Sequence, residues 1–146
     1  MVHARTRLKQ VLGIFLLLLF AICALFIYTK IRKKNEERVL VVYTAIFEVD
    51  NETAASLRVG ERLIDAKGKE DAGEILRITR EETLFEDVFG AYPLPHRVTL
   101  ALTLWGDGVR KAGDVRIGTL TPKAGEALYL LGSAKLEGLC VKVRAS

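Results

Sequence analysis

The stretch that decides the fold of this chain is RVLVVYTAIFEV, residues 38–49. It is rich in Val, Ile, Phe and Tyr, the side chains that fit best on a pleated and partly buried surface. This composition predicts a long strand that is largely buried. The chain has 146 residues, so 108 remain after residue 38 (146 − 38). That length is enough for one core but not for two.

Further strands follow along the chain. Residues 96–104 alternate in polarity, and their apolar face predicts a half-buried strand: Val98, Leu100, Leu102 and Leu104. Shorter strands are predicted at residues 62–65, 74–79, 115–117, 120–121, 127–131 and 139–143. Turns are predicted at residues 66–69 and 105–108. Asp50 or Asn51 can cap a short helix, and Gly60 ends that segment.

A second helix is predicted between the two halves of the domain. Thr79 and Glu82 fit a capping box, and Gly90 can end the helix. The apolar residues of this segment would share one helical face: Leu84, Phe85, Val88 and Phe89. Its acids are interpreted as a solvated face rather than a binding patch: Glu81, Glu82, Glu86 and Asp87. Residues 92–95 (YPLP) then form a stiff connector, because two prolines exclude a helix and a central strand.

The same order of segments occurs twice in the domain. Residues 39–49, 57–60 and 73–78 correspond to residues 96–104, 115–118 and 138–143. Two such β-units can bury their apolar faces only against each other, which predicts an internally duplicated barrel or sandwich. Val59 to Leu63 resemble the hydrophobic–Gly–acid–x–hydrophobic turn of duplicated small barrels, with Thr119 in place of the acid in the second copy. The predicted structural turn residues are Gly60, Glu61, Gly73, Gly118 and Gly138.

The N-terminal part predicts a membrane anchor. Lys9 and Lys30 bracket 20 uncharged residues, which as a helix span about 30 Å, the thickness of a bilayer core. A cleaved signal peptide usually has a shorter apolar region and a cleavage site of small residues, which Ile22-Cys23-Ala24 matches poorly. The predicted anchor residues are Val11, Leu12, Ile14, Phe15, Leu16, Leu17, Leu18, Leu19, Phe20, Ile22, Leu25, Phe26, Ile27 and Tyr28.

The charge of the chain divides unevenly between its parts. Residues 1–38 carry eight Lys or Arg and two Glu, a net charge of +6, whereas the whole chain has +4, so residues 39–146 carry −2. The mildly acidic domain argues against nucleic-acid binding. The flanking charges are too evenly divided to orient the anchor. The predicted organisation is a basic tail (1–9), a transmembrane helix (10–30), a basic linker (31–38) and a β-rich domain (39–146, divided into 39–79, 80–95 and 96–146).

Motifs of catalysis and cofactor binding are missing from the sequence. Two histidines and two unpaired cysteines do not suggest a metal site, and no glycine-rich nucleotide loop is present. No Ser, His and acid set suggests a triad. A pair of carboxylates with glycosidase-like spacing stays open, because acids are plentiful. The sequence therefore predicts a protein that is not an enzyme, with no catalytic residue and no bound cofactor or metal.

The whole layout resembles a bacterial membrane-anchored family, domain of unknown function 4330. The features that carry the resemblance are the apolar N-terminal segment, VLVVYTAIFEV, ETAASLRVGERLIDAKGKEDAGEI, HRVTLALTLWGDG, and the ending VRIGTLTPKAG…LEGLCVKV. The resemblance implies an envelope protein with its N-terminus in the cytoplasm and its domain outside. It implies no catalytic residues.

The expected function is that of a non-enzymatic scaffold or accessory subunit of an envelope assembly, with surface-polymer assembly or export as one setting. Its expected partners are the lipid bilayer and another envelope protein. An anchored ligand-binding sensor barrel and a small envelope enzyme are the alternatives.

Overall fold

The computed structural model describes residues 2–34 and 36–146, and the chain divides into two units at residues 36 and 37. Met1 in the predicted tail and Asn35 in the predicted linker lie outside the described residues. The first unit is the helix α1, Val2–Lys34. Its segment Lys9–Arg32, 24 residues, is long and apolar enough to cross a membrane. Helix therefore extends beyond residues 10–30 at both ends, since the flanking Lys and Arg are themselves good helix formers.

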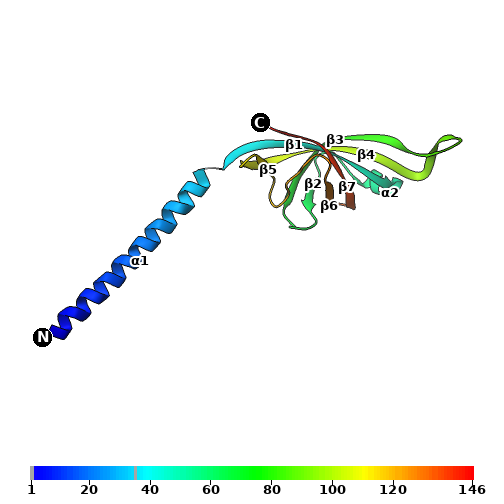
Figure 1. Cartoon of the computed structure of the whole chain (residues 1–146). Helices are drawn as coiled ribbons and strands as arrows, with labels where there is room; N and C mark the ends of the chain where they lie inside the picture. Colours follow the sequence, from blue (N-terminus) through cyan, green and yellow to red (C-terminus); the bar gives the residue numbers. More distant parts are fainter. Residues whose placement is uncertain (1, 35) are drawn as a thin grey trace. The chain divides into compact units, whose positions relative to one another are not determined.

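The second unit is mainly β. Its elements are β1 (Glu37–Asp50), α2 (Asn51–Ser56), β2 (Arg62–Asp65), β3 (Asp71–Asp87), β4 (Gly90–Lys111), β5 (Asp114–Arg116), β6 (Ala127–Leu131) and β7 (Lys135–Ala145) (Figure 1). The expected class, an N-terminal apolar helix followed by a mainly-β domain with a short helix, is confirmed. The predicted cap of α2 is confirmed as well: Asp50 accepts the N–H of Thr53 at 2.7 Å. Hydrogen bonds from Thr53 lower the pKa of the Asp50 carboxyl.

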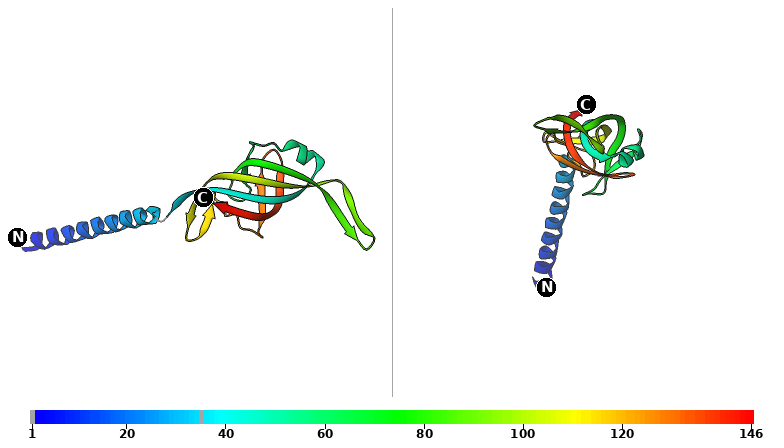
Figure 2. Two further views of the ribbon diagram at one scale, coloured as in Figure 1. Left: turned by 90° about the horizontal axis from the view of Figure 1, so that it is seen from above. Right: turned by 90° about the vertical axis from the view of Figure 1, so that its right-hand side faces the viewer.

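Six strands form a ring-like sheet in which every neighbouring pair is antiparallel. The order is β1-β7-β6-β2-β3-β4, and β4 returns to pair with β1, while β5 extends the edge of β4 (Figure 2). The link between β2 and β6 consists of two residue pairs, Ile64↔Leu131 and Asp65↔Leu130. The circuit is thus closed only narrowly at that point, so the sheet is ring-like rather than a fully paired barrel.

The interior of the ring is filled by side chains from all six strands. Alternate residues of β1 from Val39 to Val49 point inward, as strand geometry requires. They pack against inward-facing residues of the other strands, among them Leu63, Ile75 and Leu102. Tyr43 is buried among them, and its hydroxyl donates a hydrogen bond of 2.6 Å to the carbonyl oxygen of Ala72. Burial raises the pKa of Tyr43 well above its usual value.

The helix predicted between the two halves is wrong, and so is the connector after it. Residues 79–87 belong to β3 and residues 90–95 to β4, which form a hairpin in which Phe85 pairs with Tyr92. The spacing of the apolar residues from Leu84 to Phe89 fits a helical face as well as a hairpin. The segment forms a strand because a partner strand, residues 90–93, follows directly after a short turn. Pro93 is tolerated because β4 has only one neighbour in this region, in line with the rule that excludes proline from central strands.

The turn predicted at residues 105–108 is also wrong, because β4 continues through it to Lys111. Its two glycines permit close approach rather than a change of direction. A side chain at Gly108 would overlap the carbonyl oxygen of Arg116 and a methyl group of Val41. Glycine inside a strand often marks such an approach.

The first half of the domain contains a tight turn before β2. Gly60, with φ 89°, donates its N–H to the carbonyl oxygen of Ile75 at 2.8 Å. Ile75 in turn donates its N–H to the carbonyl oxygen of Glu61 at 2.9 Å. The Glu61 carboxylate accepts the N–H of Ser133 at 2.6 Å, so the acid of the motif binds a loop of the other half.

The second copy of this turn lies at Gly125 and Glu126, not at Gly118 and Thr119 as the sequence comparison predicted. Gly125 also has φ 89° and donates its N–H to the carbonyl oxygen of Cys140 at 2.8 Å. Cys140 donates its N–H to the backbone carbonyl oxygen of Glu126 at 2.9 Å. Gly118 lies in a different turn, which the bridge between residues 117 and 120 closes. The acid is therefore present in both copies, and a longer connection before the second copy shifted the alignment.

The strand register repeats in the same way. In β3, a side chain at Gly73 would meet the carbonyl oxygen of Trp105 at 2.8 Å. In β7, a side chain at Gly138 would overlap the carbonyl oxygen of Ile46, and Ile46 and Trp105 are equivalent residues of β1 and β4. Just after each glycine the pairing register shifts, past Leu76 in β3 and past residue 141 in β7.

This repetition defines a pseudo-two-fold axis that passes through two residue pairs of the ring, one between β1 and β4 and one between β2 and β6. Adding 59 to a β1 residue gives its β4 equivalent, so the pair Thr44↔Thr103 maps onto itself (44 + 59 = 103). Adding 65 relates β2 to β6 and maps the pair Asp65↔Leu130 onto itself (65 + 65 = 130). The internal duplication predicted from the sequence is thus present in the pairing itself.

Replacing Gly138 with Ala tests the close approach of β7 to β1. The added methyl group meets the carbonyl oxygen of Ile46 and the ring of Phe47, which is fixed in the core, so we expect a loss of about 3 kcal/mol in the free energy of unfolding. Gly113→Ala is the control, because it has open space around it and should lose only about 1 kcal/mol from its positive φ. Urea unfolding of residues 37–146 measures both, and equal losses would contradict the close approach.

Candidate functional site

The predicted membrane-anchor residues all lie on α1 and are exposed around its whole circumference. The least exposed of them, Leu19, still has 51% of its surface free. A helix that is apolar on every side suits a lipid environment. Cys23, in the same helix, is a free thiol.

The groups that could perform chemistry are dispersed or engaged. Among the residues that the structure describes, no three His, Cys, Asp or Glu side chains gather closely enough to hold a metal ion. Asp65 is buried, and its carboxylate accepts the hydroxyl of Thr119 at 2.9 Å and the backbone N–H groups of Lys67 and Gly68. This network closes the turn between β2 and β3, which is a structural role.

Cys140 is the thiol of the β-domain and lies buried on β7. Burial raises its pKa, because the thiolate form loses its hydration there. A buried thiol with a raised pKa is a poor nucleophile. Cys140 therefore belongs to the core rather than to a reactive site.

The feature of the domain that packing does not explain is the end of the β3–β4 hairpin. We call residues 83–95 the hairpin arm. Two-stranded pairing runs from Leu84↔Pro93 to Asp87↔Gly90, and residues 88 and 89 form the connecting loop. The arm extends beyond the strands of the ring at one end of the domain (Figure 2).

The loop of the arm is shaped by its own sequence. The Asp87 carboxylate accepts the N–H of Phe89 at 2.8 Å, and Gly90 has φ 140°, which side chains rarely allow. The hydroxyl of Tyr92 donates to the carbonyl oxygen of Phe89 at 3.3 Å. The loop thus has a defined geometry and presents Val88 and Phe89 at its tip.

Large apolar side chains of the arm face solvent. Val88 is 92% exposed and Phe89 is 83% exposed. Phe85 and Tyr92 lie opposite each other on one face, and Leu84 is exposed on the other face. Exposed apolar clusters are common at interaction sites, so the arm is the candidate site of this domain.

The arm leaves the ring through an irregular segment. Between Glu82↔Val98 and Leu84↔Pro93, four residues of β4 (94–97) face the single residue Thr83. Thr83 is buried and its hydroxyl is 2.9 Å from that of Thr99, which holds β3 in place at this point. A bulge of this kind bends a strand and redirects it.

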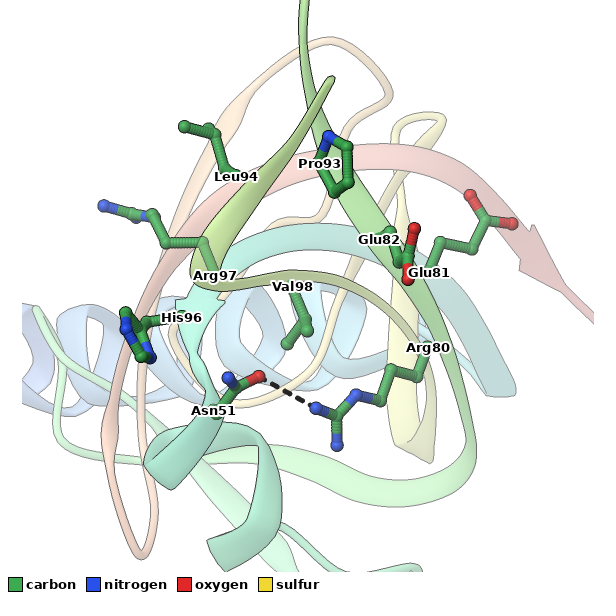
Figure 3. A pocket seen from close by; sticks show the side chains of 9 residues that line it. All are labelled: Asn51, Arg80, Glu81, Glu82, Pro93, Leu94, His96, Arg97 and Val98. Atoms are coloured by element: carbon green, nitrogen blue, oxygen red, sulfur yellow. Dashed lines mark hydrogen bonds between the residues drawn. The ribbon is translucent and has the colours of Figure 1, made fainter. Parts of the chain in front are cut away.

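An open cavity of about 300 Å³ lies at the base of the arm (Figure 3). Arg80 reaches across it to the side-chain oxygen of Asn51 at 2.8 Å, which ties β3 to the start of α2. His96 lies on the β4 side with φ 64°. The lining includes two Arg and two Glu, so it has no excess of one charge: Asn51, Arg80, Glu81, Glu82, Pro93, Leu94, His96, Arg97 and Val98.

The sequence comparison placed the apolar residues of the arm in the wrong element. Leu84, Phe85, Val88 and Phe89 were expected to share one face of a helix, whereas they lie on a hairpin and are exposed. Residues 87–90 (DVFG) lie between β-favouring residues, and this is the signal that could have revealed a two-residue hairpin loop.

Comparison with models of protein families, with curated proteins and with solved structures finds no match to this chain.

The double change Val88→Ser, Phe89→Ser tests whether the tip contributes to the fold. Both side chains are almost fully exposed, so we expect the free energy of unfolding to change by less than about 0.5 kcal/mol. Thermal and urea unfolding of residues 37–146 measure it. A loss of about 2 kcal/mol would show that the tip packs in the folded domain.

Maleimide labelling tests the burial of Cys140. In residues 37–146 it is the single thiol, and we expect it to react on the order of a hundredfold more slowly than in denatured protein. The control is Cys140→Ser with Ser146→Cys, which moves the thiol to the exposed C-terminus. Equal rates for the two folded proteins would refute the assignment.

Proposed function

We propose that this protein is a membrane-anchored, non-enzymatic scaffold or accessory subunit of a bacterial envelope assembly. The observation that carries the proposal is the exposed apolar arm on a domain that is otherwise well packed. Exposed apolar residues of this kind lower the solubility of a protein unless a partner covers them. The apolar helix at the N-terminus supplies the tether to the membrane.

The packed interior favours this function over an anchored ligand-binding barrel. Ligand sites are usually concave and mostly apolar, with a few polar groups that converge on the ligand. Inside the ring that space is occupied by side chains such as Tyr43, Phe47 and Leu102. The cavity at the base of the arm is open to solvent and bridged by Arg80.

The proposed topology has the N-terminus in the cytoplasm and the β-domain on the outer side of the cell membrane. It rests on the resemblance to domain of unknown function 4330, since the flanking charges do not decide it. Surface-polymer assembly or export is the setting that we propose.

Fusion of an alkaline phosphatase or a fluorescent reporter at Ser146 tests the topology. The C-terminus lies beside the start of β1, where Ser146 and Leu40 exchange two backbone hydrogen bonds, so the reporter is far from the arm. We expect alkaline phosphatase to be active in intact cells and the protein to resist extraction by carbonate. The opposite result would be an inactive phosphatase fusion together with a fluorescent fusion to a reporter that works only in the cytoplasm. It would place the domain on the inner side of the membrane.

A pull-down from mild detergent with a tag at Ser146 tests the scaffold function itself. We expect a second envelope protein to be recovered in a fixed ratio. Recovery of the bait alone, from cells that express the chain at its natural level, would count against a scaffold.

A further inference from the structure

We infer that the hairpin arm is the docking element, and that it inserts Val88 and Phe89 into an apolar groove of a different protein whose rim carries Lys or Arg. This inference rests on the proposed function and deepens it by assigning the partner a chemistry and the contact a place. It goes beyond the proposal because a scaffold domain offers many other surfaces.

The apolar part of the argument comes from the tip and one face of the arm. Val88 and Phe89 form the loop, and the rings of Phe85 and Tyr92 lie on paired residues behind it. Aromatic side chains at the centre of a contact supply most of the binding energy in protein interfaces. The loop is already held by the Asp87 and Tyr92 hydrogen bonds, so little conformational freedom is lost on docking.

The charge of the arm selects the partner. Residues 83–95 contain two acids, Glu86 and Asp87, and no Lys or Arg. At the base of the arm Glu81 and Glu82 are balanced by Arg80 and Arg97, so the excess of acid is confined to the arm itself. Complementary charge across an interface favours the right partner and disfavours wrong ones by several kcal/mol. A groove with a basic rim therefore fits this surface.

The same charges disfavour two other occupants. A second copy of this chain that docked arm to arm would bring the acids of one arm against those of the other, which is repulsive. An anionic lipid surface would repel Glu86 and Asp87 next to the tip, since such surfaces attract basic segments.

The backbone of the arm favours side-chain docking over the addition of a strand. Pro93 and Pro95 have no N–H to offer along the β4 edge. Along the β3 edge the acids Glu81, Glu82 and Glu86 protect the strand, as charged residues commonly do at sheet edges. The partner is thus expected to enclose the tip, with its groove against the Phe85–Tyr92 face and its rim against Glu86 on the opposite face.

The arm and the point at which the chain enters the domain lie at opposite ends of β1. The chain enters the domain at Glu37, which pairs with Arg110, whereas the other end of β1 pairs at Asp50↔Arg97, just before the arm. The arm therefore extends from the end of the domain opposite to Glu37.

Photo-crosslinking in the full-length chain tests the inference in the membranes of its own cells. A photoreactive phenylalanine analogue replaces Phe89, and the matched control carries it at Leu139, an exposed apolar residue of β7. We expect an adduct from position 89 with one different protein, at an apolar position of that protein close to Lys or Arg. The control position should give at most a weak adduct.

A charge-reversal variant provides the second test. Glu86→Lys should lower the yield of the position-89 adduct about tenfold, which corresponds to about 1.4 kcal/mol. The matched control, Glu137→Lys, makes the same change of charge at an exposed residue of β7 and should leave the yield unchanged. Equal thermal unfolding of the variants shows that the fold is retained.

Four results would overturn the inference: no adduct at position 89, an adduct with a second copy, an adduct with lipid, or a yield that charge reversal does not change. If the pull-down still recovers an envelope protein in these cases, the scaffold function stands and only the arm is misassigned. If the pull-down also returns the bait alone, the proposed function fails as well.

Discussion

The antiparallel pair of β1 and β4 is the constraint on which the rest of the domain depends. It runs without interruption from Glu37↔Arg110 to Asp50↔Arg97, and both strands turn alternate apolar side chains into the same core. Each strand uses its other edge for further partners: β7 pairs with β1, and β3 and β5 pair with β4. The ring grows outward from this pair in both directions and closes where β2 meets β6.

The duplication explains why the ring can close at all. Gly73 and Gly138 let the last strand of each half, β3 or β7, approach the central pair closely, and the bulge that follows each glycine bends that strand in the same way. The halves differ in their connections. The first half joins its long strand to the next through α2, whereas the second uses the hairpin of β4 and β5. This difference is what displaces Gly125 and Glu126 from the position expected by simple alignment.

The hairpin arm is formed at the junction of the two halves, where the symmetry has no counterpart. Thr83 facing four residues of β4 interrupts the regular ladder, and beyond this bulge the hairpin no longer contributes to the ring. Its apolar tip therefore does not pack against the core. The proposed docking function uses the one part of the hairpin that the core does not need.

The sequence by itself determined the apolar helix, the long strands, the cap of α2 and the existence of a repeat, because these depend on local composition and periodicity. Residues 38–49 are rich in apolar residues and residues 96–104 alternate between apolar and polar ones, and both patterns are typical of strands. Only the tertiary structure decided the hairpin arm, the continuation of β4 through Trp105 and the second copy of the glycine–acid turn. The spacing of Leu84, Phe85, Val88 and Phe89 suits a helical face as well as a hairpin, and the choice depends on a strand partner several residues away. The exposure of those side chains, which defines the candidate site, likewise follows from where the ring ends and not from the residues themselves.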